Sequence, residues 1–240
     1  MTLNESSRVV ILGGTSGIGL ATAQRAAAAG ATVIVASRNP ESVQRALEQL
    51  PSESIGRAVD ASSANAVAAF FDEIGEFDHF VYTAAENLVG LTLPEITAEK
   101  AAEFFGLRLF HALDAVRLAV PHLRSGGSIT LTSGTAAFKG GTGWALGTAV
   151  CGAMNSLARS LAAELAPLRV NTVAPGVLRS PLWSAMSEAD RHAMYEATGA
   201  SLPLGRVAEP DDAAKAFVAL MDQDYVTGTV AVVDGGTLVA

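Results

Sequence analysis

The stretch Val9-Val10-Ile11-Leu12-Gly13-Gly14-Thr15-Ser16-Gly17-Ile18-Gly19 joins an apolar run to a glycine-rich turn. Residues 9–12 predict a buried strand, and residues 17–29 predict a helix that closes at Gly30. Glycine is needed where a backbone turns tightly or approaches a phosphate, and a helix start offers free N–H groups to a pyrophosphate. An ordinary glycine-rich turn is the alternative, but the strand before it and the helix after it favour a dinucleotide-phosphate loop.

Short β-branched runs alternate with Ala-rich helical stretches along the rest of the chain. We expect further strands over residues 32–36, 55–59, 79–82, 128–132, 170–173 and 230–233. We expect helices over residues 41–50, 64–74, about 98–120, 144–165 and 211–221. Residues 180–204 are irregular or helical. This alternation predicts a doubly wound α/β fold with a parallel sheet, in which ligands bind outside the carboxyl ends of the strands.

Composition limits the class of protein. Of the 240 residues, 50% are hydrophobic and 17% are charged, which favours one domain over residues 1–240 with a sizeable core. The net charge of −8 argues against a nucleic-acid or anionic-membrane partner. No apolar run reaches the roughly 18 residues of a membrane span, and residues 1–8 carry no signal-peptide pattern. Cys151 is the only cysteine, so we expect no disulfide, no metal cage and a cytoplasmic, reducing location.

The end of the second expected strand indicates which dinucleotide binds. A carboxylate there would bind the 2′-hydroxyl of NAD, but this chain has Ser37, Arg38 and Asn39. Arg38 can make charge-assisted contacts to a 2′-phosphate, and the hydroxyls of Thr15 and Ser16 can add donors. A solvated surface arginine is the alternative. The pattern favours NADP(H).

Asp60 and Ala61 follow the third expected strand. Asp60 has two open interpretations. It can cap the N-terminus of the next helix, or it can contact the adenine amino group, and one residue could do both. We include Asp60 and Ala61 among the cofactor-binding candidates.

Four stretches carry a resemblance to a known family. They are Gly13-x-x-x-Gly17-x-Gly19, the helix sequence over residues 155–165, Arg169-Val-Asn-Thr-Val-Ala-Pro-Gly176 and Val233-Asp-Gly-Gly236. The chain resembles the short-chain dehydrogenase/reductase family over nearly its whole length. The resemblance implies a three-layer Rossmann-like sheet of about seven strands with helices on both faces. It also implies a lid over about residues 180–205, a homotetramer or homodimer, and a nicotinamide held by Pro175, Gly176, Val177 and Ser180. The long helices over residues 98–120 and 144–165 suit a symmetric interface.

The chain also departs from that family's pattern. The family's Asn-Asn-Ala-Gly stretch is replaced by Tyr82-Thr83-Ala84-Ala85, which keeps Ala84 and Ala85 as a small-residue floor. The family's helix asparagine aligns with Arg108, and its catalytic serine is kept as Ser133. The Tyr-x-x-x-Lys positions are occupied by Gly147 and Cys151. No shift of register restores the pair, because the chain's tyrosines and lysines are only Tyr82, Tyr195, Tyr225, Lys100, Lys139 and Lys215.

The missing tyrosine would have given a proton to a carbonyl oxygen, a contribution worth roughly 10²–10⁴ in rate. Ser133 can hydrogen-bond an oxygen but is a poor acid. Tyr195 is a candidate to supply a phenol from the lid, and a packed lid aromatic is the commoner role. Arg108 can stabilise negative charge, with a salt bridge or an interface as alternatives. Cys151 is more often a packed residue than a nucleophile. The catalytic candidates are therefore Ser133, Arg108 and Tyr195.

Three functions remain open for a small-molecule substrate. The first is hydride transfer from NADPH to an imine or an activated alkene rather than a ketone, since reduction of an iminium leaves no oxyanion to protonate. The second is a non-redox cyclase or isomerase. The third is a catalytically silent subunit that binds NADP(H), because binding and chemistry are separable.

Overall fold

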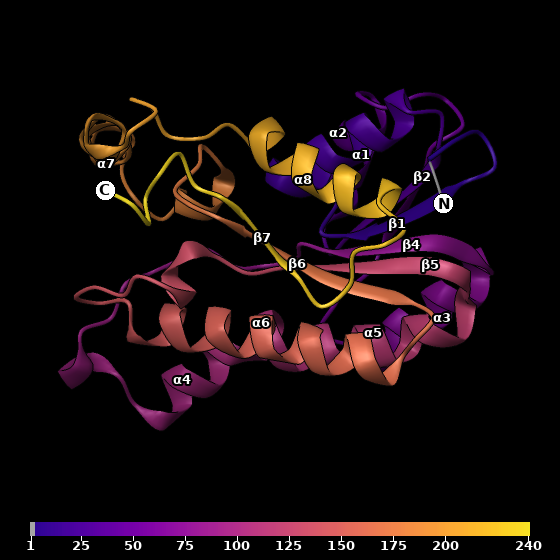
Figure 1. The fold of residues 1–240 in the computed structure, drawn as a ribbon, viewed down its shortest axis with the longest axis horizontal. Helices are drawn as coiled ribbons and strands as arrows, with labels where there is room; N and C mark the ends of the chain where they lie inside the picture. Colours follow the sequence, from indigo (N-terminus) through magenta and orange to yellow (C-terminus); the bar gives the residue numbers. More distant parts are fainter. Residues whose placement is uncertain (1–2) are drawn as a thin grey trace.

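A seven-stranded parallel sheet organises the chain, with the strand order β3-β2-β1-β4-β5-β6-β7 (Figure 1). The computed structural model describes residues 3–240. The strands are β1 (Arg8–Leu12), β2 (Thr32–Ser37), β3 (Ile55–Ala58), β4 (Phe77–Tyr82), β5 (Leu123–Thr132), β6 (Arg169–Pro175) and β7 (Val230–Val233). The predicted doubly wound parallel sheet is confirmed, and every expected strand is present. The strands β4 and β5 begin earlier than expected.

Helices cover both faces of the sheet, as Figure 1 shows. The face with α3 (Ala64–Ile74), α5 (His111–Ala119) and α6 (Ala145–Glu164) buries alternate strand residues such as Val10 and Leu12. The opposite face, with α1 (Gly17–Ala28) and α8 (Pro210–Asp222), buries the residues between them, such as Val9 and Ile11. This period of two is the reason that strands buried on both faces read as continuous apolar runs. The remaining helices are α2 (Pro40–Leu47), α4 (Ala98–Phe105) and α7 (Glu188–Ser201).

The long helix expected over about residues 98–120 is present as an unbroken helical stretch over residues 98–119, but a π-helical turn divides it into two α-helices. The helix α4 ends at Phe105, a π-helical turn covers Gly106–Phe110, and α5 follows. The Tyr82 hydroxyl at the end of β4 donates to the main-chain oxygen of Leu107 inside this turn, at 2.7 Å. A side chain that inserts into the helical ladder in this way widens the turn.

The lid expected over residues 180–205 has a fixed base. The short 3-10 helix Pro181–Trp183 and α7 lie between two segments that pair with each other. The Arg179 N–H donates to the Ala208 oxygen at 2.8 Å, and the Ala208 N–H donates to the Val177 oxygen at 3.1 Å. The segment expected to be a lid is therefore a loop whose two ends are joined by main-chain hydrogen bonds.

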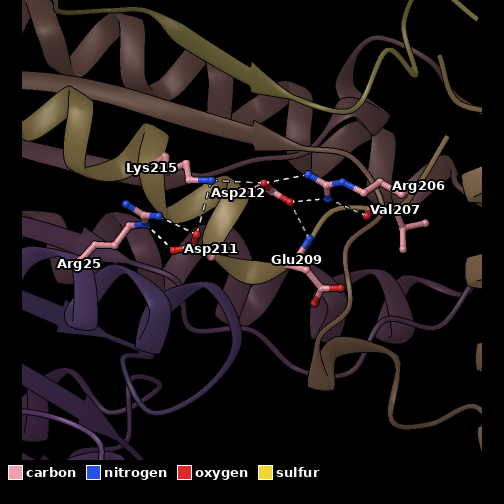
Figure 2. Close-up of polar contacts among 7 residues, drawn as sticks. All are labelled: Arg25, Arg206, Val207, Glu209, Asp211, Asp212 and Lys215. Atoms are coloured by element: carbon pink, nitrogen blue, oxygen red, sulfur yellow. Dashed lines mark hydrogen bonds and ion pairs between the residues drawn. The ribbon is translucent and has the colours of Figure 1, made fainter. Parts of the chain in front are cut away.

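Charged side chains hold the lid base against α8 (Figure 2). Asp212 accepts from the Arg206 guanidinium at 2.7 Å and from the Glu209 N–H at 2.9 Å, which caps α8. Lys215 bridges Asp212 and Asp211, and Asp211 pairs with Arg25 of α1. The network joins α1, α8 and the segment that leaves the lid.

Within residues 3–240, no helix combines the length and apolar character needed to cross a bilayer. No cluster of three or more His, Cys, Asp or Glu side chains over the same residues is arranged to hold a metal ion.

Candidate cofactor and substrate site

Two adjoining cavities open at the carboxyl ends of the strands, where a parallel sheet places its ligands. The larger cavity has a volume of about 650 Å³ and lies over β1 and β2, and the smaller one has a volume of about 420 Å³. The two share a wall, and the shared residues are Ile18, Thr83, Ala84, Ala85, Thr132, Ser180 and Leu182. A ligand in the larger cavity therefore borders the smaller one.

Two glycines make the phosphate loop close-fitting. Gly13 has φ +93°, and a Cβ there would lie 2.5 Å from the Ala84 nitrogen. A Cβ on Gly19 would lie 2.2 Å from the Gly13 oxygen. The N-cap residue of α1, Ser16, makes no side-chain cap bond, and the first turn of α1 carries no acidic residue. The first N–H groups and the positive end of the helix dipole are thus available to a phosphate.

Arg38 lies in the larger cavity and is exposed. No carboxylate of the described chain is within ion-pair distance of it, so its guanidinium is available to a phosphate. Asn39 also lines the cavity, and its side chain caps α2 by accepting from the Glu41 N–H at 2.8 Å. These residues and the glycine cradle fit a dinucleotide with a 2′-phosphate.

The interpretation of Asp60 as a helix cap was wrong. Ser63 caps α3 by accepting from the Ala66 N–H. Asp60 instead accepts from the N–H and the hydroxyl of Ser62, at 3.0 and 2.8 Å. These bonds, the main-chain one first, lower the pKa of the Asp60 carboxyl. Its carboxylate lines the larger cavity with Ala61 and can still accept from an adenine amino group.

The other predicted cofactor residues divide between the two cavities. The larger cavity is lined by Gly13, Thr15, Ser16, Gly17, Ile18, Gly19, Ser37, Ala84, Ala85 and Ser180. Pro175, Gly176 and Val177, at the end of β6, line the smaller one. The sequence reasoning missed Val59, Glu86, Asn87 and Leu107 in the larger cavity. These residues carry no motif and reach the site only through the fold.

Ser133, Gly147 and Cys151 line the smaller cavity together. The Ser133 hydroxyl donates to the main-chain oxygen of Cys151 at 3.1 Å. Burial raises the pKa of the Cys151 thiol to about 11, against smaller opposing effects of Ser133 and Arg108. The thiol is therefore protonated at neutral pH, which disfavours a nucleophilic role.

Trp144 occupies the space beside Gly147. A Cβ on Gly147 would lie 3.2 Å from Cε3 of the Trp144 ring. Trp144 also meets Trp183 edge to face, with ring centroids 6.1 Å apart and planes at 74°. Gly147, which the sequence resemblance aligns with the family's tyrosine, thus lies in contact distance of the Trp144 indole.

Arg108 enters the smaller cavity from the π-helical turn. Its Nη2 donates to the main-chain oxygens of Glu86 at 2.6 Å and Asn87 at 3.3 Å, and its guanidinium lies 4.4 Å from the centre of the Phe104 ring. The Glu86 carboxylate is 3.9 Å away. Burial lowers the pKa of Arg108 from its ordinary value, and the Glu86 charge opposes this. Arg108 thus connects the edge of the larger cavity, at Glu86 and Asn87, to the smaller cavity.

The structure does not bring Tyr195 to the other catalytic candidates. Tyr195 is buried against Trp183 and Val207, and the Arg179 guanidinium lies 4.7 Å from its ring centre. It lines neither of the two cavities. The phenol that does line the smaller cavity is Tyr82, which donates to Leu107 and whose pKa burial raises well above its usual range. A phenol suited to give up a proton is therefore missing from the lining of this cavity.

Comparison with known proteins gives the same family as the sequence motifs. A family model described as enoyl-(acyl carrier protein) reductase matches residues 13–237. The short-chain dehydrogenase/reductase ATR9 of Stachybotrys chlorohalonatus is 37% identical over 246 aligned positions, covering 95% of each chain.

Two solved structures are similar over nearly the whole chain. The MalC reductase/Diels-Alderase of Malbranchea aurantiaca superposes with a TM-score of 0.90 at 29% identity, covering 99% of this chain and 98% of MalC. An NADPH-bound short chain oxidoreductase of Pseudomonas aeruginosa PAO1, described as containing an atypical catalytic center, has the same TM-score, identity and coverage. The fold, the glycine loop and these matches agree, and the chain belongs to the short-chain dehydrogenase/reductase family.

Proposed function

We propose that this protein is an oxidoreductase that uses NADP(H) to reduce a carbon–nitrogen double bond or an activated alkene in a small organic substrate. The observation that carries the proposal is the pairing of an intact dinucleotide cavity with a substrate cavity in which Gly147 and Cys151 replace the proton-donating pair. Reduction of an iminium yields a neutral amine, so its rate falls least when no phenol is present to donate a proton. The rate of ketone reduction falls most, because its product oxyanion must be protonated.

NADP(H) is the cofactor that this site takes. The glycine loop and the start of α1 would hold the pyrophosphate, Arg38 and Ser37 the 2′-phosphate, and Asp60 the adenine. Pro175, Gly176 and Val177 line the cavity where the nicotinamide belongs. When bound, the cofactor supplies a hydride.

The chain's own residues then orient the substrate and stabilise charge. The Ser133 hydroxyl can donate to a polar atom of the substrate once it leaves the Cys151 oxygen. Arg108 holds positive charge at the same cavity, where low exposure strengthens its effect on developing negative charge. We assign Tyr195 to lid packing rather than to chemistry, because it lies behind Trp183.

A cyclase activity is the second candidate. MalC, with a similar fold, is named both a reductase and a Diels-Alderase. A cavity of about 420 Å³ with aromatic walls can hold a reactive substrate in a folded shape. Product formation without any change in nicotinamide absorbance would identify this activity.

We also infer a symmetric oligomer, a homodimer or homotetramer in the cytoplasm. Phe110 and Leu113, at the junction of the π-helical turn and α5, are 56% and 41% exposed. Both side chains lie on the same long helical stretch, which suits a symmetric helix-on-helix interface with a second copy.

Cofactor titration followed by turnover tests the proposal. We expect micromolar binding of NADPH, weaker binding of NADH, and loss of absorbance at 340 nm with 3,4-dihydroisoquinoline or 2-cyclohexenone. Cyclohexanone should react much more slowly. Ser133→Ala and Arg108→Met should lower kcat while leaving the NADPH affinity within a few-fold, whereas Tyr195→Phe should leave kcat unchanged. Failure to bind either cofactor, or fast reduction of the ketone, contradicts the proposal.

A further inference from the structure

The hydroxyl groups that line the smaller cavity are largely engaged in contacts within the protein. Five of them donate to main-chain oxygens at distances between 2.7 and 3.1 Å, and they belong to Tyr82, Thr83, Thr132, Ser133 and Thr237. A hydroxyl has one proton to donate, so a ligand in this cavity meets few free donors.

The two cationic side chains of the lining, Arg108 and Lys139, also have partners within the protein. Arg108 donates to the main-chain oxygen of Glu86 at 2.6 Å and lies 3.9 Å from the carboxylate of the same residue. The Lys139 Nζ donates to oxygens of Thr237 at 3.0 Å and Ala240 at 2.9 Å. No aspartate or glutamate is among the lining residues. A charged ligand would therefore lose its water without gaining a free opposite charge, which is costly.

Aromatic side chains form much of the remaining wall. Phe104, Trp144 and Trp183 all line the cavity, and the Trp183 indole N–H is used by the Leu178 oxygen at 3.1 Å. Apolar walls of this kind gain free energy when they bury an apolar surface of a ligand. The interior thus suits an uncharged apolar body.

Exposed apolar side chains continue this surface at the mouth of the cavity. Lys139 is exposed and also lines the cavity, so the mouth lies at this residue. Phe138 directly precedes it and is 52% exposed. Val239 is 84% exposed and lies between Thr237 and Ala240, the two residues whose oxygens Lys139 contacts. Phe138 and Val239 therefore stand on adjoining segments of the mouth.

Val89 adds a third exposed apolar side chain to the mouth. It is 55% exposed and follows Leu88, which lines the cavity. The Leu91 N–H donates to the Gly143 oxygen at 3.0 Å, which holds this loop beside the segment that follows Lys139. Large apolar side chains that gather in water beside a cavity are typical of a binding surface.

We propose that the substrate is an uncharged molecule with an extended apolar body. Its reacting end lies in the cavity beside Ser133, and its far end crosses the mouth over Val89, Phe138 and Val239. The ligand's role as substrate rests on the proposed function. The substrate class narrows to neutral imines or activated alkenes that carry a large apolar substituent.

Calorimetric titration of the NADP⁺-saturated protein with 4-hexylbenzamide, 4-hexylbenzoate and 4-hexylbenzylamine tests the charge of the ligand. The three probes share one apolar body and are neutral, anionic and cationic at neutral pH, and NADP⁺ carries no hydride to transfer. We expect the amide to bind at least about fivefold more tightly than either ion, because neither ion finds an unpaired opposite charge. Equal or tighter binding of either charged probe overturns the proposal.

The affinity of 4-methylbenzamide, compared with that of 4-hexylbenzamide, tests the extended body. Each added methylene should tighten binding about twofold, which is less than full burial would give because the mouth faces water. Phe138→Ser should reduce this gain several-fold and leave the affinity of 4-methylbenzamide unchanged. Tyr225→Ser is the control, because Tyr225 is also an exposed ring but precedes β7, at the amino end of that strand, and lines neither cavity.

Three outcomes of the length series contradict the proposal. They are equal affinities of the two amides, a gain that is unchanged in Phe138→Ser, and no binding of any probe at millimolar concentration. The titrations measure binding alone, so failure of the reductase reaction shows separately, as tight binding of the neutral probe without turnover of imines or enones.

Discussion

We expect His79 to lower the free energy of unfolding as the pH is reduced from 7 to 4. Its ring is fully buried, Nδ1 lies 2.8 Å from the Ser128 hydroxyl, and Nε2 has no partner among the described residues. Burial, opposed by Asp78 and assisted by Arg169, lowers the pKa of His79 from 6.5 to about 4. The unfolded chain therefore takes up this proton first as the pH falls.

The size of the effect follows from the two pKa values. The neutral ring contributes about 3 kcal/mol to the free energy of unfolding above pH 6.5, and about 2 kcal/mol of this is lost by pH 5. The contribution disappears as the pH falls towards about 4. Three aspartates with shifted pKa values titrate below this pH range, because those values are lowered from 3.8. They are Asp60, Asp211 and Asp212.

Urea unfolding followed by tryptophan fluorescence at pH 8 and pH 5 measures the effect. His79→Asn keeps a polar group near Ser128 but cannot titrate in this range. The wild-type protein should lose about 2 kcal/mol more than the variant between the two pH values. The other three histidines are present in both proteins, so they cancel. Equal losses in the two proteins would refute the assignment.

Three further substitutions test the site and its support. Arg38→Ala should raise the Kd for NADPH about tenfold and leave that for NADH unchanged, measured by fluorescence titration, whereas Arg45→Ala on the neighbouring helix should change neither. Gly19→Ala should lower both the melting temperature and the NADPH affinity, because its Cβ would meet main chain at 2.2 Å, while Gly152→Ala, with nothing within 4 Å, should not. Asp212→Ala removes the cap bond to the Glu209 N–H and the ion pairs of Asp212 with Arg206 and Lys215 (Figure 2), and should cost about 1–2 kcal/mol in urea unfolding, with a smaller loss in 0.5 M salt.

The features that follow from short stretches of sequence were predictable. Residues 9–12 read as a buried strand because every side chain is apolar, and the glycine spacing after it marks a close-fitting turn, in which a Cβ on Gly19 would meet the Gly13 oxygen. The cofactor cavity was therefore found from its motifs. The place of Ser133 in the smaller cavity was also predictable, because Ser133 is the first residue after β5.

Other features depend on contacts between distant segments and could not be predicted. The π-helical turn at Gly106–Phe110 forms where the Tyr82 hydroxyl reaches Leu107, 25 residues away. Tyr195 lies within the segment 180–205 expected to be a lid, but its side chain is buried with Trp183 and Val207 and lines neither cavity. Lys139 lines the smaller cavity and donates to the Thr237 oxygen in the segment after β7, almost 100 residues further along the chain.

The indole of Trp144 over Gly147 bears on how this site can evolve. A tyrosine introduced at position 147 alone would have to displace that ring, since even a Cβ there approaches Cε3 at 3.2 Å. It would also arrive without a lysine at position 151. The residue at position 147 is therefore coupled to the tryptophan at position 144, and a larger side chain at position 147 requires a compensating movement or change of that ring.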